Sequence, residues 1–347
     1  GSPNHYNEWN NLSLETLSGD LKGAFGDGVG ISTFWTNKTE DIDAIVKKAL
    51  AGAPDIIGIS IQPGSMDNVK ALVERLNTEQ AVKDGKVIVA FGNQIPTYIP
   101  EKLIAMCPKG VVIRGEGEMS LRGLVRVAKG ELKLSDVPSA VYMDRDSGKI
   151  VHTQIIPPKL DSLEYPPTPD TYAGIARRGG NVQVQASRGC PWGGCAYCTR
   201  SSFRRGGIVI EKGRTASWEG FTVERVLKTL DDVMAQGITE VEFSDDDFIG
   251  GRKEENISRI IAIAEGIDNL SRKHGIKFSF RIFTRPNIIY REGDADGKNE
   301  AMVQALLKMK KAGLVKLFIG VEAGNESQLK RYTRGMKLSE TAQAIKI

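Results

Sequence analysis

The stretch Ala186-Ser187-Arg188-Gly189-Cys190-Pro191-Trp192-Gly193-Gly194-Cys195-Ala196-Tyr197-Cys198 decides how this chain is organised. It holds three of the four cysteines in the 347-residue sequence. Three thiolates on one short loop can hold a metal centre, but closed zinc and iron–sulfur sites take a fourth protein ligand as a rule. A [4Fe–4S] cube held by Cys190, Cys195 and Cys198 would leave one iron open to a substrate or cofactor. The glycines of the stretch let the backbone wrap closely around a bulky centre.

Two other interpretations of the cysteines remain open. A structural zinc site needs a fourth ligand, and the histidines His5, His152 and His274 are distant in sequence. A disulfide framework is untypical of a long chain with few cysteines. The fourth cysteine, Cys107, precedes a proline and is predicted to be a small buried hydrophobe.

Composition places the chain among ordinary globular proteins, with 40% hydrophobic and 26% charged residues. The length predicts two domains. A net charge of +4 is too small to indicate a nucleic-acid partner. No apolar run is long enough to cross a bilayer. No signal peptide is visible, and Gly1-Ser2 is typical of the remnant of a cleaved tag, so we expect a reducing, cytoplasmic setting.

The domain pattern begins with a polar tail over 1–18, followed by alternating strands and helices over 19–155. The expected strands are 29–35, 55–62, 86–93 and 110–115, the expected helices are 40–50, 66–76, 100–106 and about 120–129, and a hairpin joins 140–143 to 150–153. Repeated βαβ units predict a doubly wound, Rossmann-like α/β domain with its ligand site at the carboxyl ends of the strands. A linker rich in proline follows over 156–180.

Small and polar residues follow three of these strands, at 62–65, 92–94 and 115–118. They fit either ordinary βα turns or a ligand site that needs close approach of the backbone. No G-x-G-x-x-G sequence opens a helix after the first strand, which argues against a dinucleotide.

A second βα series runs over 181–347. Its expected strands are 182–186, 240–244, 276–283 and 314–322, and its expected helices are 222–235, 254–274, 299–312 and from 338 onward. Thr222 is the expected N-cap of the first helix. The loop over 199–220 is rich in arginine and glycine. Such a series predicts a parallel barrel whose active site lies at the strand C-termini.

Charged residues follow the strands of this second series. Ser244, Asp245, Asp246 and Asp247 come after its second strand and suit an ammonium group; capping of the next segment and a divalent metal are alternatives. Arg281 and Arg285 flank the end of the third strand. They could pair with a carboxylate, although solvated arginines are as compatible with the sequence.

At the cysteine stretch the chain resembles the radical S-adenosylmethionine (SAM) superfamily. The usual spacing there is C-x3-C-x2-C, and the extra residue here falls in a Gly-Gly loop where it is geometrically cheap. The resemblance implies that Cys190, Cys195 and Cys198 ligate a [4Fe–4S] cluster and that SAM occupies the fourth iron. It further implies that Tyr197 lies near the adenine, that Ser244, Asp245 and Asp246 contact the SAM amino group, and that Glu322 contacts the ribose or carboxylate.

The superfamily barrel has six βα units, and we count four, so the fold expected is a partial (β/α)6 barrel. A half barrel leaves an open parallel edge, which proteins avoid, and we therefore expect further chain to follow.

The segments 90–93 and 114–118, together with the cysteine stretch, resemble a cobalamin-binding domain fused to a radical SAM domain. The residues that the resemblance places near cobalamin are Gln62, Gly64, Ser65, Gly92, Asn93, Gly115, Glu116 and Gly117. The D-x-H-x-x-G signature is absent, which implies a cobalt without a protein imidazole.

The function that the resemblance implies is a radical SAM enzyme using cobalamin, most simply a methyltransferase acting on an unactivated carbon of a small-molecule or peptide substrate. A donor such as flavodoxin or ferredoxin would reduce the cluster, and the basic residues around it could recruit that donor. These residues are Arg177, Arg178, Arg188, Arg200, Arg204 and Arg205. The alternatives are ring formation, ring contraction or rearrangement with the same cofactors, a radical SAM enzyme without cobalamin, and a non-catalytic cobalamin or iron–sulfur sensor.

Overall fold

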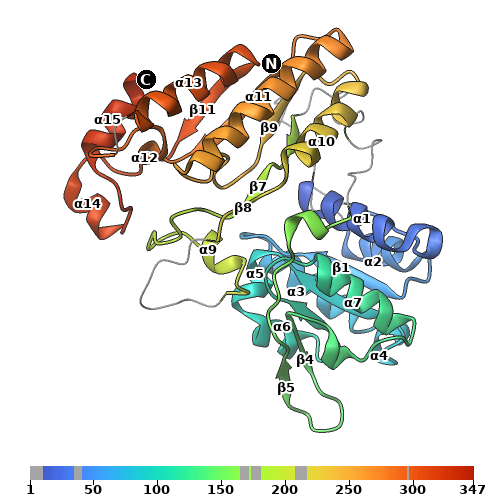
Figure 1. Cartoon of the computed structure of the whole chain (residues 1–347). Helices are drawn as coiled ribbons and strands as arrows, with labels where there is room; N and C mark the ends of the chain where they lie inside the picture. The colour runs from blue at the N-terminus through green and yellow to red at the C-terminus, as the bar shows by residue number, and fades with distance from the viewer. Residues whose placement is uncertain (1–10, 35–40, 165–171, 173–180, 208–216, 295–296) are drawn as a thin grey trace, which may run out of the picture. The chain divides into compact units, whose positions relative to one another are not determined.

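The computed structural model describes residues 11–34, 41–164, 172, 181–207, 217–294 and 297–347. The chain divides into two compact units, which Figure 1 draws with their elements labelled. The N-terminal unit comprises Thr16–Tyr165 and Ser202–Val209. The C-terminal unit comprises Gly1–Glu15, Pro166–Ser201 and Ile210–Ile347. Residues 156–164, expected to begin the linker, belong to the N-terminal unit.

The sheet of the N-terminal unit has five strands in the order β1-β2-β3-β4-β5. Strands β1 (Ile56–Ser60), β2 (Ile88–Gly92) and β3 (Val111–Ile113) are parallel. Strands β4 (Ala140–Met143) and β5 (Ile150–His152) continue the sheet as an antiparallel hairpin. The parallel strands and the hairpin predicted from the sequence are therefore confirmed.

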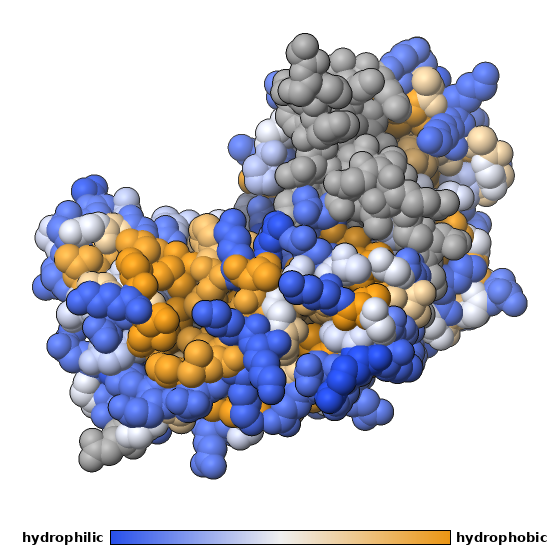
Figure 2. Space-filling view, turned by 90° about the horizontal axis from the view of Figure 1, so that it is seen from above, coloured by the Kyte–Doolittle hydropathy of each residue, from blue (hydrophilic) through white to orange (hydrophobic). Residues whose placement is uncertain are grey.

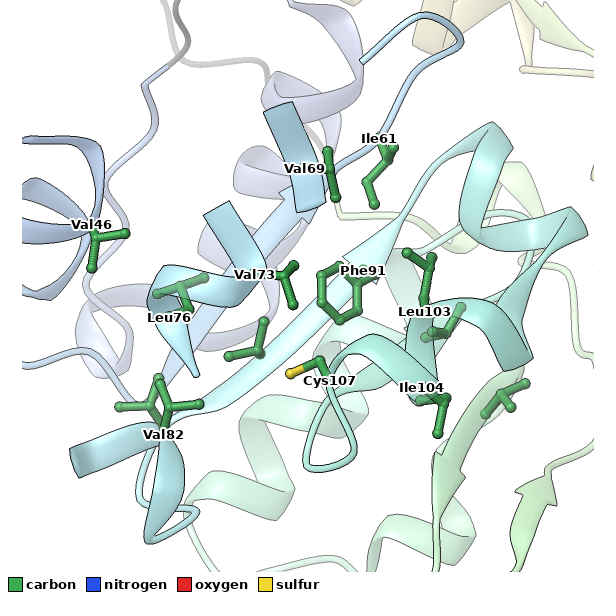
Figure 3. Packing of buried hydrophobic residues seen from close by; sticks show 14 residues of the cluster. Val46, Ile61, Val69, Val73, Leu76, Val82, Phe91, Leu103, Ile104 and Cys107 are labelled. Atoms are coloured by element: carbon green, nitrogen blue, oxygen red, sulfur yellow. The ribbon is translucent and has the colours of Figure 1, made fainter. Parts of the chain in front are cut away.

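Helices cover both faces of this sheet because alternate residues of each strand point to opposite sides. On one face Phe91 packs with residues of α3 (Met66–Leu76) and α6 (Pro100–Met106), and Figure 3 shows this core. On the other face Ala90 packs with Leu124 of α7 (Glu118–Ala128). The remaining helices are α2 (Ile42–Leu50), α4 (Gln80–Lys83) and α5 (Gln94–Tyr98). The doubly wound architecture is confirmed.

Cys107 is one of the side chains in the core of Figure 3, where it is 1% exposed. Burial raises the pKa of its thiol. The prediction of a small buried hydrophobe is confirmed.

Two expectations at the start of the chain are corrected. Residues expected in a polar tail form helix α1, Leu12–Phe25; the first ten residues lie outside the described part. The described residues of the expected strand over 29–35, Val29–Phe34, have no regular structure. Asp20 of helix α1 is fully buried and pairs with Arg122 of α7, which links the two helices. A long-range ion pair of this kind leaves no periodic signal in the sequence.

The C-terminal unit is built on a parallel sheet in the order β11-β10-β9-β6. These strands are β6 (Val182–Val184), β9 (Glu240–Phe243), β10 (Ser279–Thr284) and β11 (Leu314–Ile319). A short antiparallel ribbon, β7 (Ser187–Arg188) with β8 (Glu219–Gly220), follows β6. The expected series of parallel strands is confirmed.

Helices α10 (Val223–Ala235), α11 (Glu254–His274) and α13 (Lys298–Lys311) lie side by side along this sheet (Figure 1). The buried residues of α10 recur at helical spacing, and the Thr222 side chain accepts a hydrogen bond from the Arg225 N–H, as an N-cap does. Phe243 and Phe280 meet edge to face, with ring centroids 5.9 Å apart. Shorter helices complete the unit: α9 (Arg200–Phe203), α12 (Pro286–Ile289), α14 (Glu326–Arg331) and α15 (Leu338–Lys346).

Strand β11 ends the order of this sheet and carries exposed apolar residues. Val315 is 64% exposed and Phe318 is 51% exposed. Figure 2 shows apolar area on its left side, the side on which Figure 1 draws β11, α13 and α15. Within the described ranges, no helix combines the length and apolar character that crossing a membrane requires.

Candidate cluster site and cofactor-binding edge

The cysteine stretch begins directly after strand β6, at the carboxyl end of the parallel sheet. Asp245, two residues beyond β9, holds its start. One carboxylate oxygen accepts from the Ser187 hydroxyl, and both lie 3.2 Å from the Ala186 nitrogen. Asp245 is 3% exposed, and burial raises its pKa to about 7. Its oxygens are thus used inside the protein, so we assign Asp245 a positioning role instead of the expected contact with the SAM amino group.

Asp247 performs a similar task between β9 and β10. Its carboxylate accepts from the Gly250 N–H at 2.8 Å, the Thr284 hydroxyl at 3.1 Å and the Arg285 N–H at 3.2 Å. The side chain is fully buried, and burial raises its pKa to about 6. Asp247 therefore fixes the backbone from which Arg285 extends.

A segment far along the chain, Tyr332–Gly335, brackets the cysteine stretch. The Trp192 indole N–H donates to the Thr333 carbonyl at 2.8 Å, and the Thr333 hydroxyl donates to the Gly194 carbonyl at 2.6 Å. The Ala196 N–H donates to the Tyr332 carbonyl at 3.0 Å. This segment was not predicted from the sequence, because its local signal there is no more than a Thr-Arg-Gly turn after α14.

Two arginines reach the middle cysteine. Arg334 Nη1 lies 3.4 Å from Cys195 Sγ, and Arg285 Nη1 lies 3.6 Å from the same atom. Both side chains are 5% exposed. Arg285 also donates to the Arg334 carbonyl, its guanidinium lies over the Trp192 ring at 5.4 Å, and Arg334 donates to the Gly320 carbonyl. The pair is held in place independently of Cys195.

All three cysteines of the stretch are free thiols. Burial raises the pKa of Cys190 and of Cys198, while backbone N–H groups of the loop act in the opposite direction. Within the described residues, no three His, Cys, Asp or Glu side chains are gathered to hold a single metal ion. In a [4Fe–4S] cube each thiolate binds a different iron, so the three sulfurs need to be spaced apart and need not converge on one point. A loop that carries three cysteines can place its sulfurs in this way. The donor set fits an iron–sulfur cluster.

Tyr197 and Glu322 lie near this set. Tyr197 is 47% exposed, packs edge to face on Tyr332 at 5.1 Å and hydrogen-bonds to Glu322. Desolvation raises the pKa of Tyr197 well above its ordinary value. Glu322 has a φ of 64°, which non-glycine residues adopt rarely and mostly at functional or strained positions. Glu322 Oε1 lies 3.9 Å from Arg334 Nη2, so it shares the charge network of Cys195.

The other residues expected at the SAM site are placed differently. Ser244 donates to the Val184 carbonyl at 3.4 Å, and half-buried Asp246 lies 3.4 Å from Arg200 Nε. The expectation that Arg281 flanks the end of its strand is wrong. Arg281 lies within β10 and pairs with Glu240, the first residue of β9, away from the carboxyl ends of the strands. Arg285 takes the strand-end position instead.

The strand-end edge of the N-terminal unit has open backbone at two glycines. A Cβ placed on Gly64 or Gly92 would have no atom within 4 Å. Asn93, at a φ of 84°, donates to the Ser60 hydroxyl at 2.9 Å and accepts from the Gln94 N–H, so it joins the ends of β1 and β2. Gln62 is exposed, and its carbonyl accepts from the Ser65 hydroxyl. This edge could receive a broad, flat cofactor such as cobalamin.

Residues after β3 are covered instead of open. Gly115 donates to the Thr97 hydroxyl at 2.9 Å, and a Cβ on it would meet the Phe203 carbonyl at 2.7 Å. Glu116 is buried and pairs with Arg204 at 3.1 Å. Gly117 is the N-cap of α7. The segment Ser202–Gly207 therefore lies over Gly115 and Glu116, whereas the described residues leave open space at Gly64 and Gly92, at the β1 and β2 ends.

The absence of a protein imidazole on the cobalt, expected from the sequence, stays a prediction. The histidine of the N-terminal unit, His152, lies on β5 and pairs with Glu101 at 3.3 Å. Arg177 and Arg178, expected in the basic group, lie outside the described residues, as does most of the expected linker.

Comparison with known families agrees with both parts of the chain. Residues 4–125 match the B12 binding domain and residues 184–347 match the radical SAM superfamily. A B12-binding domain followed by a radical SAM domain defines the class of protein. The chain belongs to the cobalamin-dependent radical SAM enzyme family.

Two characterised relatives share this arrangement in sequence. One is a 4′-phospho-dehydrooxetanocin synthase from Priestia megaterium, 30% identical over 345 residues, or 97% of this chain and 44% of the relative. The other is a hopanoid C-3 methylase from Methylococcus capsulatus, 25% identical over 67% of this chain and 39% of the relative.

Solved structures give the same result. The cobalamin-dependent SAM radical enzyme OxsB, with aqua-cobalamin and SAM bound, has a TM-score of 0.84 and 27% identity over 98% of this chain and 45% of its own. The methyltransferase TsrM from Kitasatospora setae has a TM-score of 0.63 at 13% identity over 93% of this chain and 58% of its own, a likeness of fold alone. The chain spans less than half the length of OxsB and of both characterised relatives.

Proposed function

We propose that this chain binds a [4Fe–4S] cluster, SAM and cobalamin and uses them to start a radical reaction on a small-molecule substrate. The observation that carries the proposal is the cysteine stretch. It presents three free thiols after a parallel strand and is fixed by Asp245 on one side and by Thr333 on the other. Thiolates on a rigid loop at a strand end suit a cluster with one exchangeable iron.

The chain's own residues have distinct tasks in this proposal. Cys190, Cys195 and Cys198 would hold the cluster, whose chemistry is to give one electron to bound SAM, splitting it into methionine and a 5′-deoxyadenosyl radical. Glu322, Tyr197, Ser244 and Asp246 would orient SAM. Asp245 and Asp247 keep the loop and Arg285 in position.

Cobalamin would lie on the open β1 and β2 ends, against Gly64 and Gly92 and beside Asn93. A glycine with no neighbour within 4 Å of its Cβ position lets a flat ring approach the backbone closely. Bound there, cobalamin can supply or exchange a group at its cobalt. The protein contributes the flat edge and the Asn93–Ser60 bond that fixes it.

For the overall reaction we propose a synthase-type outcome, in which the substrate is rebuilt without gaining a methyl group from SAM. Support comes from the synthase relative, which is 30% identical over 97% of this chain. Methylation of an unactivated carbon is the second candidate, and the hopanoid methylase relative supports it over 67% of the chain. Both outcomes use the same residues described above.

The proposal of radical chemistry is tested by anaerobic reconstitution with iron and sulfide, followed by dithionite and SAM. We expect 5′-deoxyadenosine and methionine in equal amounts, measured by mass spectrometry. The triple variant C190A/C195A/C198A should form neither product, while C107A, which removes the cysteine in the core, should retain both. A wild-type chain that binds no cluster and cleaves no SAM would rule the proposal out.

The two outcomes are separated with SAM carrying a deuterated methyl group, added with a panel of small phosphorylated compounds, because the name of the synthase relative denotes one. A product without the label supports the synthase-type outcome. A product heavier by the labelled methyl supports methylation and overturns our first choice.

A further inference from the structure

Cys195 differs from its two neighbours in what surrounds its sulfur. Cys190 receives backbone N–H groups of Trp192 and Gly193, and Cys198 receives that of Arg200. Cys195 Sγ instead has two guanidinium groups, those of Arg334 at 3.4 Å and Arg285 at 3.6 Å. Guanidinium donors carry full charge, so they stabilise negative charge on sulfur more than backbone groups do.

The two arginines are buried, and most of their other bonds hold them rigid. Each donates to a backbone carbonyl, Arg285 to that of Arg334 and Arg334 to that of Gly320. Burial lowers the local dielectric and so strengthens a charge–charge interaction. Arginine side chains are not deprotonated in proteins, so both guanidinium groups carry their positive charge. The pair is charged and preorganised.

One donor of the pair has no acceptor in the part of the chain that the structure describes. Among the described residues, Arg334 Nε is buried and makes no hydrogen bond. Buried donors in folded proteins are nearly always satisfied, and an orphan at a functional site indicates an acceptor that the protein does not itself supply. A sulfide of a cluster bound beside Cys195 is such an acceptor.

From these contacts we propose that Arg285 and Arg334 form a guanidinium clamp on Cys195 that raises the reduction potential of the cluster. The inference rests on the proposed cluster at Cys190, Cys195 and Cys198. Reduction adds one electron, and therefore one negative charge, to the cluster. Hydrogen bonds and positive charge at a ligating sulfur stabilise that reduced state and raise the potential. The clamp makes the cluster easier to reduce by a cellular donor.

The test is a potentiometric titration of the reconstituted chain, with the EPR signal of the reduced cluster as readout. In R334Q and in R285Q, which lose the charge, we expect the ratio of reduced to oxidised cluster at a fixed potential to fall about tenfold, or about 59 mV for one electron. R334K and R285K keep the positive charge but lose the planar set of guanidinium donors. In these variants the decrease in the ratio of reduced to oxidised cluster should be smaller.

The matched control is R252Q. Arg252 lies in the same unit with its side chain 8% exposed; it pairs with Asp294 at 2.7 Å, and its other hydrogen bonds go to Asn299 and to the Ile288 and Ile289 carbonyls. R252Q should lose stability but keep the wild-type potential. This separates a positioning effect at Cys195 from a general loss of packing.

Each possible result either supports or overturns the proposed clamp. Unchanged potentials in R334Q and R285Q, or an equal shift in R252Q, overturn the clamp while leaving the proposed function intact. If the glutamine variants hold no cluster, the lysine variants decide: a wild-type potential overturns the clamp and a lower one supports it. A wild-type chain without a cluster overturns the clamp and the proposed function together.

Discussion

Asp245 shows how burial changes the role of a single side chain. Its position after a strand suggested contact with a positively charged ligand group, yet its oxygens face the Ala186 nitrogen and the Ser187 hydroxyl. The carboxyl is shielded from water, which is why its pKa rises to about 7. The sequence shows that Asp245 follows a strand. It does not show that Ala186 and Ser187, which follow the neighbouring strand β6, bind the Asp245 carboxylate.

We expect Asp245 to make stability depend on pH. With a folded-state pKa of about 7, it keeps its proton in the folded state between about pH 4 and pH 7, where the unfolded chain loses it. Stability therefore falls as pH rises through this window, by up to about 1.4 kcal/mol per pH unit. D245N, which carries no titrating group there, should show a shallower fall in urea unfolding of the cluster-free chain. D67N, at an exposed residue, should match wild type, and an equal slope in D245N would contradict the assignment.

Gly335 is the residue at which an added methyl group should disturb the cysteine stretch most. It has a φ of 60°, and a Cβ there would overlap the Trp192 ring. G335A should displace Trp192, lower the iron bound per chain after reconstitution, and destabilise by about 1–3 kcal/mol. G237A has a similar φ of 76° but open space around it, so it isolates backbone strain. Equal iron content in both variants would refute the steric argument.

At the scale of elements, an ion pair between Asp20 and Arg122 joins helix α1 to α7. Arg122 Nε lies 2.8 Å from Asp20 Oδ2, its Nη2 reaches Oδ1, and the Glu164 N–H donates to Oδ1 at 3.0 Å. The Asp20 side chain raises the pKa of Arg122. This cluster joins α1, α7 and the segment before residue 165.

Removing the carboxylate should leave the charge of Arg122, whose side chain is 18% exposed, without its hydrogen-bonded partner. We expect D20A to lower the free energy of unfolding by about 3–5 kcal/mol, measured by urea denaturation. The double variant D20L/R122M, which replaces both charges by apolar groups, should recover most of the loss. A D20A chain as stable as wild type would show that α1 does not need the pair.

Elements with a local signal were predictable from the sequence. Strands β1 and β2 have continuous apolar runs, and helix α3 spans the residues expected. The cysteine stretch was predictable because its three thiols are close in sequence. Helix α1 and the Tyr332–Gly335 bracket were not, because the contacts that define them join residues about a hundred or more positions apart. Arg281 and Arg285 look alike in sequence, and only the strand register separates them.

At the scale of the whole molecule, the end strand β11 is the surface feature with a physical consequence. Val315 and Phe318 are apolar, exposed and on a strand at the end of the described sheet order. Exposed apolar edges favour strand-to-strand association.

Charge on this edge should reduce association of the chain with itself. V315K and F318K should each raise the concentration at which light scattering first appears, because lysine on an edge strand opposes pairing. L307K changes a comparably exposed side chain, at 51%, that lies on helix α13 and not on the strand. Its effect should be smaller; if it protects as well as V315K does, general charge and not the strand edge is the cause.

The placement of Ser202–Gly207 has a consequence for how the protein is made. This segment packs on Gly115 and pairs with Glu116 in the N-terminal unit, although it is encoded after the cysteine stretch. Domains commonly fold in order as the ribosome releases them. Here the first unit stays unfinished until Cys198 has emerged, since only four positions separate that cysteine from Ser202. Completion of the N-terminal unit would thus be timed to the arrival of the cysteine stretch.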